Sequence, residues 1–455
     1  MIFERADVTA PSRIRADARA VDGWPARGLA AAAVLMGLGL IVPVIFGWAV
    51  NAHSFAPLSA LWRPRFGAGT VPAIGFGVAA VIWAPRLAAT LDWPRLLAAT
   101  YAAGVVWLTS LATVDGWFGI GGVLGRSGEY LQAARGVGSM STALREFISR
   151  IPIGSHGSWP THVAGHPPGA LLFFALLVHV GLGGGLAAGW VVLLIGATTP
   201  VAVLLTLRQL GAEVAARRVV PFLVIGPAAI WIAVSADGMF AAVAAWGLCC
   251  LAMAVTQRTV VLSLAWSVPA GLLLGCCAFL SYGLSLLAIL AVAVAVTARR
   301  GWPLIGAALA ALAVVLAFAA AGYVWWDALP ALRARYYAGI ASHRPAAYWV
   351  WGDLAALCFS AGPALGASAA ATVRGFRTNL TRRKPIVALS LAAWMCVLVA
   401  DISFMSKAET ERIWLPFVPW LLLGAALLPD QWHRRGLAVQ VTLAILTQSL
   451  LFTRW

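Results

Sequence analysis

The chain has 455 residues, of which 62% are hydrophobic and 11% are charged, and its mean hydropathy is +0.88. A soluble globular protein carries about 25% charged residues, so this composition excludes a string of soluble domains, and it also excludes a disordered chain or a coiled coil. The net charge of +16, from 32 Lys and Arg against 16 Asp and Glu, is in a membrane protein first a signal of orientation, because basic residues collect in cytoplasmic loops.

The apolar segments predict an all-α, polytopic integral membrane protein, because a membrane-spanning helix needs about 20 mostly apolar residues. We interpret residues 1–28 as a cytoplasmic N-terminal segment and residues 29–455 as a single transmembrane domain. About 13 spans are predicted, at 29–50, 71–90, 95–114, 186–206, 219–235, 237–255, 260–280, 281–298, 303–325, 352–373, 385–403, 413–428 and 436–452. A further apolar segment, 167–183, is interpreted as a partly inserted or re-entrant helix.

The charged connectors decide how the chain is oriented. If segment 167–183 does not cross and the N-terminus is cytoplasmic, 20 of the 32 basic residues lie on the inner side, including those of connectors 207–218, 299–300 and 374–384. If that segment crossed, these connectors would all lie outside, against the positive-inside rule. We therefore predict a plasma-membrane protein with a cytoplasmic N-terminus and an outer C-terminus. Only two lysines occur beside 30 arginines, which together with the excess of Ala and Gly is typical of a high-GC bacterial genome.

The acidic residues gather on the opposite side from the basic connectors. Acids are not expected to follow the orientation rule, so their clustering needs another explanation, and a reaction site at the outer membrane surface would supply one. Nine of the 16 acids fall on or near the predicted outer face: Asp115, Glu129, Glu146, Asp237, Asp327, Asp353, Asp401, Glu409 and Glu411.

Two predicted outer loops are long, residues 115–166 and residues 326–351, and long loops in compact proteins are usually functional or disordered. Within the first loop, segments 129–135 and 141–151 have apolar residues at helical spacing and predict short amphipathic helices on the membrane surface. The loop ends in a rigid polar turn that carries three histidines and then Pro167-Pro168-Gly169: His156, His162 and His166.

The second loop contains Arg335 and other arginines interleaved with Tyr and Trp, a combination that suits anionic lipid head groups and sugar faces. In the turn of the first loop, His156 and His162 are interpreted as polar loop residues. The spacing of the three histidines matches no helical or finger motif, so no metal site is predicted from it.

Taken together, these motifs resemble the GT-C superfamily of membrane glycosyltransferases, which includes protein O-mannosyltransferases and lipid A aminoarabinose transferases. The family pattern is an acid in the first large outer loop, a nearby Tyr on a surface helix, and a basic-Pro-Pro turn that opens an apolar helix. The matching segments are Asp115, Glu129-Tyr130-Leu131, His166-Pro167-Pro168, Ser235–Gly238 with Asp237, Gly271–Leu286, and Glu411–Phe417 with Arg412.

The resemblance implies inverting transfer of a hexosyl or pentosyl group, such as mannosyl, from a polyprenyl-phosphate sugar to a glycan or glycolipid acceptor in cell-wall biogenesis. The family's acids before the Tyr are replaced here by Arg126-Ser127-Gly128, so either Asp115 or Glu129 is the catalytic carboxylate. The resemblance assigns donor phosphate or sugar binding to His166, Arg412, Lys407 and Arg335, and acceptor or supporting roles to Tyr130, Asp237 and Glu411.

Such a transfer needs a carboxylate to take the acceptor proton and cations to stabilise the leaving phosphate. Several of these residues also have simpler explanations. Asp115 also fits an interfacial cap or a solvated acid, Glu129 a solvated acid on a surface helix, and His166 a turn residue. Asp237 also fits the N-cap of a span, and Arg412 also fits a structural ion pair with its neighbouring acids. No resident cofactor is predicted, whereas participation of a divalent cation is left open. The expected partners are the lipid-linked donor, the acceptor and membrane lipids, and no nucleic acid.

Two other classes of function remain as alternatives. A secondary transporter or lipid-linked sugar flippase would show inverted repeats and charges at mid-membrane, and the sequence has no obvious repeat. A non-catalytic assembly partner of envelope enzymes is the third hypothesis. The sequence has no Walker A pattern, which argues against ATP-driven transport.

Overall fold

The computed structural model describes residues 10–52, 55–377 and 384–453, with side chains for residues 23–52, 55–377 and 385–453. Predictions that concern residues 1–9 and 378–383, part of the N-terminal segment and part of the connector 374–384, lie outside the described residues. Almost all of the described chain is helical, as predicted, and the protein is a multi-span helical membrane protein.

Long apolar helices form the body of the fold. Within the described residues, eight are long and apolar enough to cross a membrane, and a ninth would be a pair bent by 103°. The eight are α1 (Ala10–Ile45, apolar from Gly23), α2 (Thr70–Thr90), α3 (Trp93–Ala112), α9 with α10 (Gly185–Gly196 and Thr199–Gln209), α13 (Ala236–Thr256), α14 (Val260–Leu280), α16 (Pro303–Ala320) and α20 (Lys384–Ile402). The bent pair is α18 (Ala346–Ala361) with α19 (Ala364–Arg377).

The predicted count of 13 spans is not confirmed, because four predicted segments do not form long apolar helices. Segment 219–235 is broken between α11 (Glu213–Val224) and α12 (Ala229–Ile232), and segment 413–428 between α21 (Thr410–Ile413), α22 (Val418–Leu421) and a 3-10 helix. Segment 281–298 starts with a 3-10 turn before α15 (Leu287–Ala298). The fourth segment, 436–452, lies mostly in α23 (Asp430–Leu450), which is long enough to span a membrane. Its first turns are polar, however, because they contain Asp430, His433 and two arginines. Broken helices at membrane depth are tolerated where protein buries them.

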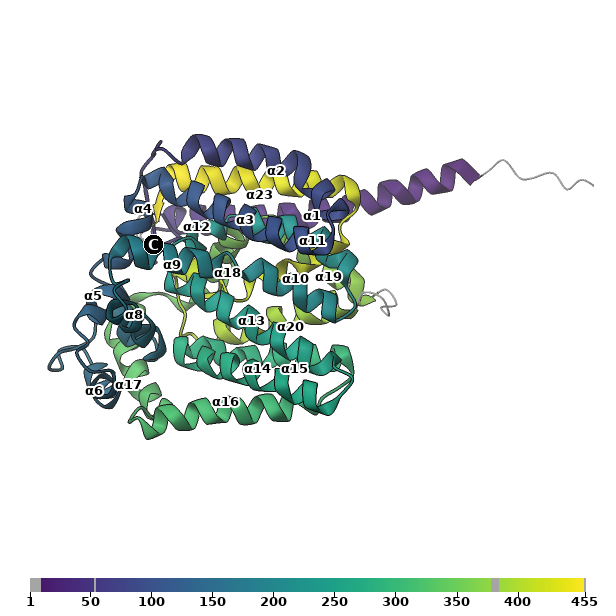
Figure 1. The fold of residues 1–455 in the computed structure, drawn as a ribbon. Coiled ribbons are helices and arrows are strands. Elements are labelled where there is room, and N and C mark those ends of the chain that lie inside the picture. The colour runs from purple at the N-terminus through teal and green to yellow at the C-terminus, as the bar shows by residue number, and fades with distance from the viewer. Residues whose placement is uncertain (1–9, 53–54, 378–383, 454–455) are drawn as a thin grey trace, which may run out of the picture.

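One end of the bundle carries the short elements of both long loops (Figure 1). The helices predicted within loop 115–166 correspond to α5 and α6. The C-terminus lies at this end as well, where β2 (Leu451–Thr453) pairs antiparallel with β1 (Ala60–Trp62). The short helices are α4 (Phe118–Gly121), α5 (Tyr130–Arg135), α6 (Met140–Glu146), α7 (Thr161–Gly165), α8 (Gly169–His179) and α17 (Trp325–Ala338). At 11 residues, α8 is too short to cross a bilayer by itself.

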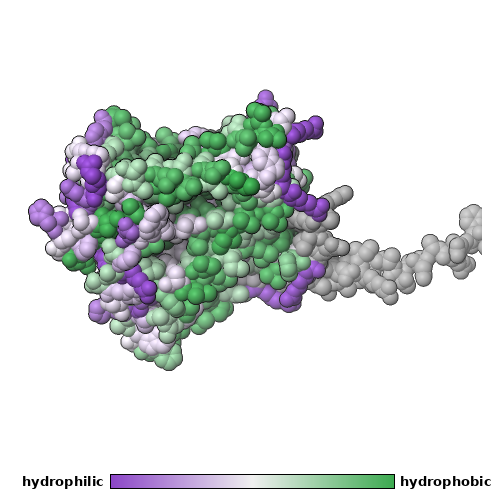
Figure 2. All heavy atoms as spheres, turned by 90° about the horizontal axis from the view of Figure 1, so that it is seen from below, coloured by the Kyte–Doolittle hydropathy of each residue, from purple (hydrophilic) through white to green (hydrophobic). Residues whose placement is uncertain are grey.

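The other end of the bundle carries the basic connectors. Their arginines bind carbonyl oxygens and an acid of neighbouring segments. Arg217 donates to the carbonyl oxygens of Ala88 and Leu91 in the connector between α2 and α3, at 3.1 and 2.7 Å. Arg218 pairs with Asp430 at the start of α23, at 2.6 Å. Between the two ends, apolar side chains cover the middle of the face shown in Figure 2 and hydrophilic side chains gather at its two ends. This distribution is that of a protein whose middle lies in lipid.

Small residues let α14 and α16 pack backbone against backbone. A Cβ atom on Gly271 would lie 2.0 Å from the carbonyl oxygen of Ala307, and one on Gly275 would lie 2.9 Å from the Cα atom of Ala311. This close approach is the small-xxx-small packing by which helices associate in membranes, where apolar side chains gain little by leaving lipid.

We predict that Gly271→Ala destabilises the protein by about 1–3 kcal/mol, the usual cost of forcing an extra group into a packed site. Gly37→Ala in α1 is the matched control, because a Cβ atom there meets nothing within 4 Å. Thermal unfolding of the purified variants in one detergent, followed by circular dichroism, measures the difference. Equal midpoints for the two variants would show that α14 and α16 do not pack this closely.

Candidate active site

Among the arginines and lysines of the described chain, Arg412 is the most buried, with a side chain that is 2% exposed. It lies in α21, at the end of the bundle that holds the long loops. Three carboxylates from three separate parts of the chain surround its guanidinium group. Nε lies 3.3 Å from Oδ2 of Asp237, Nη1 lies 3.6 Å from Oε1 of Glu129, and Nη2 lies 3.8 Å from Oε2 of Glu409. We call these four residues the acid–arginine cluster.

Local structure explains how two of the acids reach the arginine. Asp237 lies in the first turn of α13, but the N-cap is Ser235, whose Oγ accepts from the backbone N–H of Gly238 at 3.0 Å. Asp237 is therefore free of the capping role that the sequence also allowed, and its side chain pairs with Arg412. Glu129 immediately precedes α5 and likewise makes no side-chain cap bond.

Glu409 is placed by a strained turn. Ala408 and Glu409 both have positive φ values, 67° and 64°, a conformation that non-glycine residues seldom adopt. Asp353 of α18 holds this turn, because its Oδ1 accepts from the N–H of Ala408 at 2.9 Å. Arg344 contacts the other oxygen of Glu409 at 3.3 Å. Arg344 belongs to the second long loop, so this loop contacts the site through Glu409. Backbone strain of the kind found at Ala408 and Glu409 is common at functional sites.

His162 joins the cluster to the first long loop. Its Nδ1 accepts a hydrogen bond from Nη2 of Arg412 at 3.0 Å, and its Nε2 lies 3.6 Å from Oε1 of Glu129. Because Nδ1 accepts, the network assigns the proton of the neutral ring to Nε2, on the side of Glu129. Burial and the positive charge of Arg412 lower the pKa of His162 well below its ordinary value, so the ring is neutral.

Burial sets the protonation of Glu129. Removal of its carboxyl group from water raises the pKa to about 7, and Arg412 opposes this rise. For Arg412 itself, burial acts to lower the pKa, but the charges of Asp237, Glu129 and Glu409 outweigh burial and keep the pKa above its ordinary value. A permanent cation therefore stands beside a carboxyl group that exchanges its proton near neutral pH, which is the range in which a general base works best.

Tyr130 and His166 line the apolar side of the cluster. The Tyr130 ring stacks on Phe174 with centroids 5.5 Å apart, and it meets the His166 ring edge-on at 5.9 Å. The Tyr130 hydroxyl is buried and has no hydrogen-bond partner among the described residues. His166 donates from Nδ1 to the carbonyl oxygen of His162 at 2.9 Å, which fixes its ring and leaves Nε2 as an acceptor.

The structure places Asp115 in a different network. Both of its carboxylate oxygens accept from Nη1 of Arg65 at 2.8 Å, and Arg65 also binds the carbonyl oxygens of Gln448 and Leu451. Asp115 therefore fastens the C-terminal strand to the end of α3. The link between Asp115 and the cluster is Arg126, which lines a small cavity with Asp115 and exerts its charge on Glu129.

Three other predicted site residues hold loops in place. Arg335 donates to the carbonyl oxygens of Ile151 and Trp159 at 2.6 and 2.9 Å and so ties α17 to the first loop. Lys407 donates to the carbonyl oxygens of Ala341 and Arg344. Glu411 accepts from the N–H of Ser59 at 2.9 Å, and burial raises its pKa to about 7.

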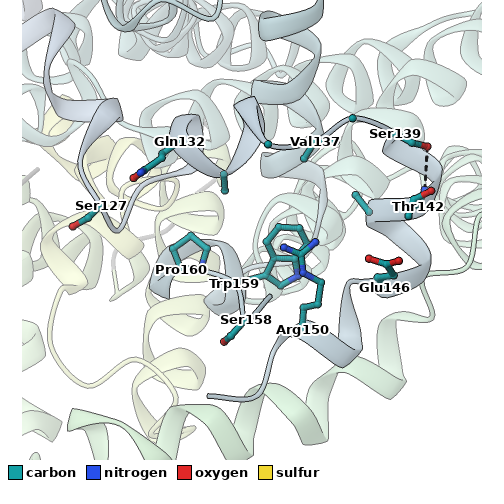
Figure 3. A pocket seen from close by; sticks show the side chains of 14 residues that line it. Ser127, Gln132, Val137, Ser139, Thr142, Glu146, Arg150, Ser158, Trp159 and Pro160 are labelled. Carbon is teal, nitrogen blue, oxygen red and sulfur yellow. Dashed lines mark hydrogen bonds between the residues drawn. The ribbon is translucent and has the colours of Figure 1, made fainter. Parts of the chain in front are cut away.

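A polar cavity of about 760 Å³ lies in the first long loop, between α5, α6 and the segment around Trp159 (Figure 3). Its wall includes Ser127 and Pro160, each two residues before a member of the site, Glu129 and His162. The cavity is formed wholly by the first long loop.

The acid–arginine cluster does not fit a metal ion, because the guanidinium group of Arg412 occupies the place among the carboxylates that a cation would take. Consistently, no group of three or more His, Cys, Asp or Glu residues in the described chain could hold one.

Sequence reasoning selected Glu129, Asp237 and Arg412 but missed how the site is completed. The sequence predicts His162 only as a polar loop residue, Glu409 only as one of the outer acids, and Arg344 only as one of the arginines of the second loop. The signals were present but weak: His162 lies four residues before the His-Pro-Pro turn, and Glu409 lies three residues before Arg412. The partners of His162 and Arg344 come from segments far away in the sequence, and these segments meet only in the folded protein.

The fold and the site define a multi-span helical membrane protein with a buried acid–arginine cluster at one end of its bundle. No family model and no curated protein matches the chain. Among solved structures, it is similar to the crystal structure of the Archaeoglobus fulgidus oligosaccharyltransferase in complex with Zn and sulfate, with 15% sequence identity and a TM-score of 0.45. The similarity covers 77% of this chain and 53% of that chain, so this chain spans about half the length of the protein it matches.

We predict that Arg412→Gln costs about 3–5 kcal/mol of stability at pH 8, because it leaves buried carboxylates without their cation. The loss should shrink as the pH falls from 8 to 5. Without Arg412, the folded-state pKa of Glu129 rises further above its unfolded value, and such a group stabilises the fold at low pH and ceases to do so as the pH rises.

Thermal unfolding of the variant across this pH range tests the prediction, with Arg333→Ala as the control for loss of one positive charge at an exposed position. A loss of stability that does not depend on pH would contradict the view that Arg412 offsets buried carboxylate charge.

Proposed function

We propose that the chain is a membrane glycosyltransferase that moves a hexosyl or pentosyl group from a polyprenyl-phosphate donor to a hydroxyl group of a glycan or glycolipid of the cell envelope. The observation that carries this proposal is Glu129, a carboxyl group with its pKa raised to about 7, which contacts Arg412 and belongs to the loop that also forms a polar cavity at one end of the membrane bundle. We place this end on the extracytoplasmic side, since the basic connectors gather at the other end.

In the proposed reaction, the acceptor hydroxyl oxygen attacks the anomeric carbon of the donor sugar. The bond between that carbon and the phosphate oxygen breaks, the phosphate leaves with the bonding electron pair, and the configuration inverts. The hydroxyl proton passes to Glu129. A carboxyl group that is half ionised near neutral pH can accept this proton and later return it to water.

Glu129 is a better candidate for the base than Asp115. Both oxygens of Asp115 are engaged by Arg65, whereas Glu129 contacts Arg412 and His162 at 3.6 Å. These longer contacts leave the Glu129 oxygens less tightly bound than those of Asp115. Tyr130 directly follows Glu129 in the chain and its ring meets that of His166. Tyr130 and His166 are proposed to contact the transferred sugar.

We propose that the donor phosphate is held by arginines other than Arg412, whose charge is already balanced by three carboxylates. Arg63, Arg65 and Arg126 surround the ring of Phe452, with guanidinium carbons 5.1 to 5.4 Å from its centroid. Asp115 pairs with Arg65, and Arg63 and Arg126 add two further positive charges at this place. Arginine is well suited to phosphate because its planar fork matches two oxygens at once.

The position of the cluster favours an enzyme over the alternative of a transporter or flippase. Transporters place their charged binding sites near the middle of the membrane, between broken helices. Here the charged residues come from loop 115–166, from the first turn of α13 and from α21. A site at the end of the bundle suits a lipid-linked donor, whose phosphate lies at the membrane surface.

The test is transfer of a radiolabelled sugar from a polyprenyl-phosphate donor by the purified protein in liposomes. We predict that Glu129→Gln lowers the rate by about 10²–10⁴-fold, the usual contribution of a general base. Asp115→Asn should retain measurable transfer, and Asp327→Asn, an exposed acid on α17, is the control for loss of a negative charge.

Circular dichroism of each variant shows whether the fold is kept. If Asp115→Asn abolished transfer while Glu129→Gln remained active, the base would be Asp115. If the wild-type protein transferred no sugar from any polyprenyl-phosphate donor, the proposed function would be wrong.

A further inference from the structure

The polar cavity of the first long loop has the size and lining of a small-molecule site. Its volume of about 760 Å³ falls within the range of about 300–1,000 Å³ that ligand pockets occupy. Figure 3 shows side chains from three segments facing it: Gln132 from α5, Thr142 and Glu146 from α6, and Arg150 and Trp159 from the segment that follows. None of these residues takes part in the proposed reaction.

Several polar groups in the cavity are unused by the fold. The Gln132 amide, the Ser127 hydroxyl and the Glu146 carboxylate make no side-chain hydrogen bond to any residue that the structure describes. Arg150 donates from Nε to the carbonyl oxygen of Gly157 at 2.7 Å, and its Nη atoms make no hydrogen bond within the described part of the chain. The cavity thus offers an amide, a hydroxyl, a carboxylate and a guanidinium fork, the groups that bind sugar hydroxyls.

A planar surface forms one wall. The Arg150 guanidinium carbon lies 3.4 Å from the centroid of the Trp159 ring. The indole is fixed in turn, because its Nε1 donates to the carbonyl oxygen of Phe147 at 3.1 Å and its ring packs on the Phe147 ring at 5.4 Å. A rigid flat surface surrounded by a few directional polar groups is the arrangement that orients a ring-shaped polar ligand.

The charges of the lining residues indicate whether the cavity suits an anionic, a cationic or a neutral ligand. Glu146 and Arg150 are the two charged residues that line the cavity, and their charges cancel. A phosphate or other anion would meet the Glu146 carboxylate, and a cation would meet Arg150. The lining therefore favours a neutral ligand rich in hydroxyl groups.

The cavity and the proposed base lie in the same loop and are connected through the backbone. The carbonyl oxygen of Gly128 accepts from the N–H of His162 at 3.2 Å, and this bond joins the two chain segments that line the cavity through Ser127 and Pro160. His162 is the donor of that bond, and Glu129 directly follows the acceptor Gly128. The segments that form the cavity therefore also carry the proposed base and its histidine partner.

We propose that this cavity binds the neutral saccharide portion of the acceptor, an extension that rests on the proposed glycosyl transfer. Gln132, Glu146 and the Arg150 fork hold hydroxyl groups of the saccharide, and the stacked Arg150 and Trp159 hold the face of one ring. The site sets acceptor affinity and takes no part in breaking the donor bond.

Binding of saccharide is measurable without any transfer. Saturation-transfer difference NMR on the purified full-length protein in detergent would use three neutral probes, α-1,6-mannotriose, α-1,5-arabinotriose and cellotriose, and one anionic probe, glucose 1-phosphate. At least one neutral trisaccharide should bind better than glucose 1-phosphate. Gln132→Ala and Glu146→Gln should each weaken that binding by about tenfold, the effect of about 1.4 kcal/mol.

The controls separate the site from general effects. Asp327→Asn removes an exposed acid from the same end of the bundle, outside the cavity, and should leave binding unchanged. Since Gln132 and Glu146 bind no other described residue through their side chains, their variants should keep the wild-type unfolding temperature. In the transfer assay, the two cavity variants should raise the KM for acceptor about tenfold with little change in kcat.

Each outcome decides one of the two proposals. Absence of binding by all three trisaccharides, binding that the cavity variants do not alter, or preference for glucose 1-phosphate would overturn the saccharide site. Transfer activity with an unchanged acceptor KM in both variants would overturn it too and leave the proposed function standing. Saccharide binding that depends on Gln132 and Glu146 in a protein without transfer activity would retain the site and overturn the proposed function.

Discussion

The contact of Arg412 with Glu129, Asp237 and Glu409 is the interaction on which the end of the bundle depends. Each acid comes from a different segment: the first long loop, the start of α13 and the strained turn before α21. A buried arginine without these partners would be costly, and so would three buried acids without the arginine. The cluster therefore fixes the position of the first loop relative to the helices, and with it the position of the polar cavity.

The same contact sets the chemistry of Glu129. Burial alone favours the neutral carboxyl, and Arg412 restores part of the stability of the carboxylate, so that the pKa lies at about 7. His162 is held neutral by burial and by the same arginine. A fully exposed carboxyl would be ionised but a weak base, and a fully isolated one would keep its proton. The balance between burial and one cation gives a group that can both accept and release a proton.

Much of the bundle could be predicted from sequence, because span length and apolar composition depend on local residues. The predicted spans 71–90, 237–255 and 260–280 lie close to α2, α13 and α14. The predicted spans 219–235 and 413–428 are not confirmed, because each is broken into short helices. Such breaks are tolerated only where surrounding protein buries the backbone, which a local pattern does not reveal.

For the site, the residue types indicated Glu129, Asp237 and Arg412 but not their contact. The pairing of Asp115 with Arg65 was also beyond local reasoning, since it depends on the distant strands β1 and β2 meeting. Such contacts form only in the folded chain, and no sequence pattern near either residue indicates them.

The most direct test of this account is the titration of Glu129 itself. Difference infrared spectroscopy of the purified protein between pH 5 and pH 9, with Glu129→Gln to identify the band, follows the protonated carboxyl group. The account predicts that the Glu129 carboxyl band disappears with a midpoint near pH 7. A midpoint near 4.5, as for an exposed carboxyl, would contradict the claim that burial and Arg412 together hold Glu129 ready for proton transfer.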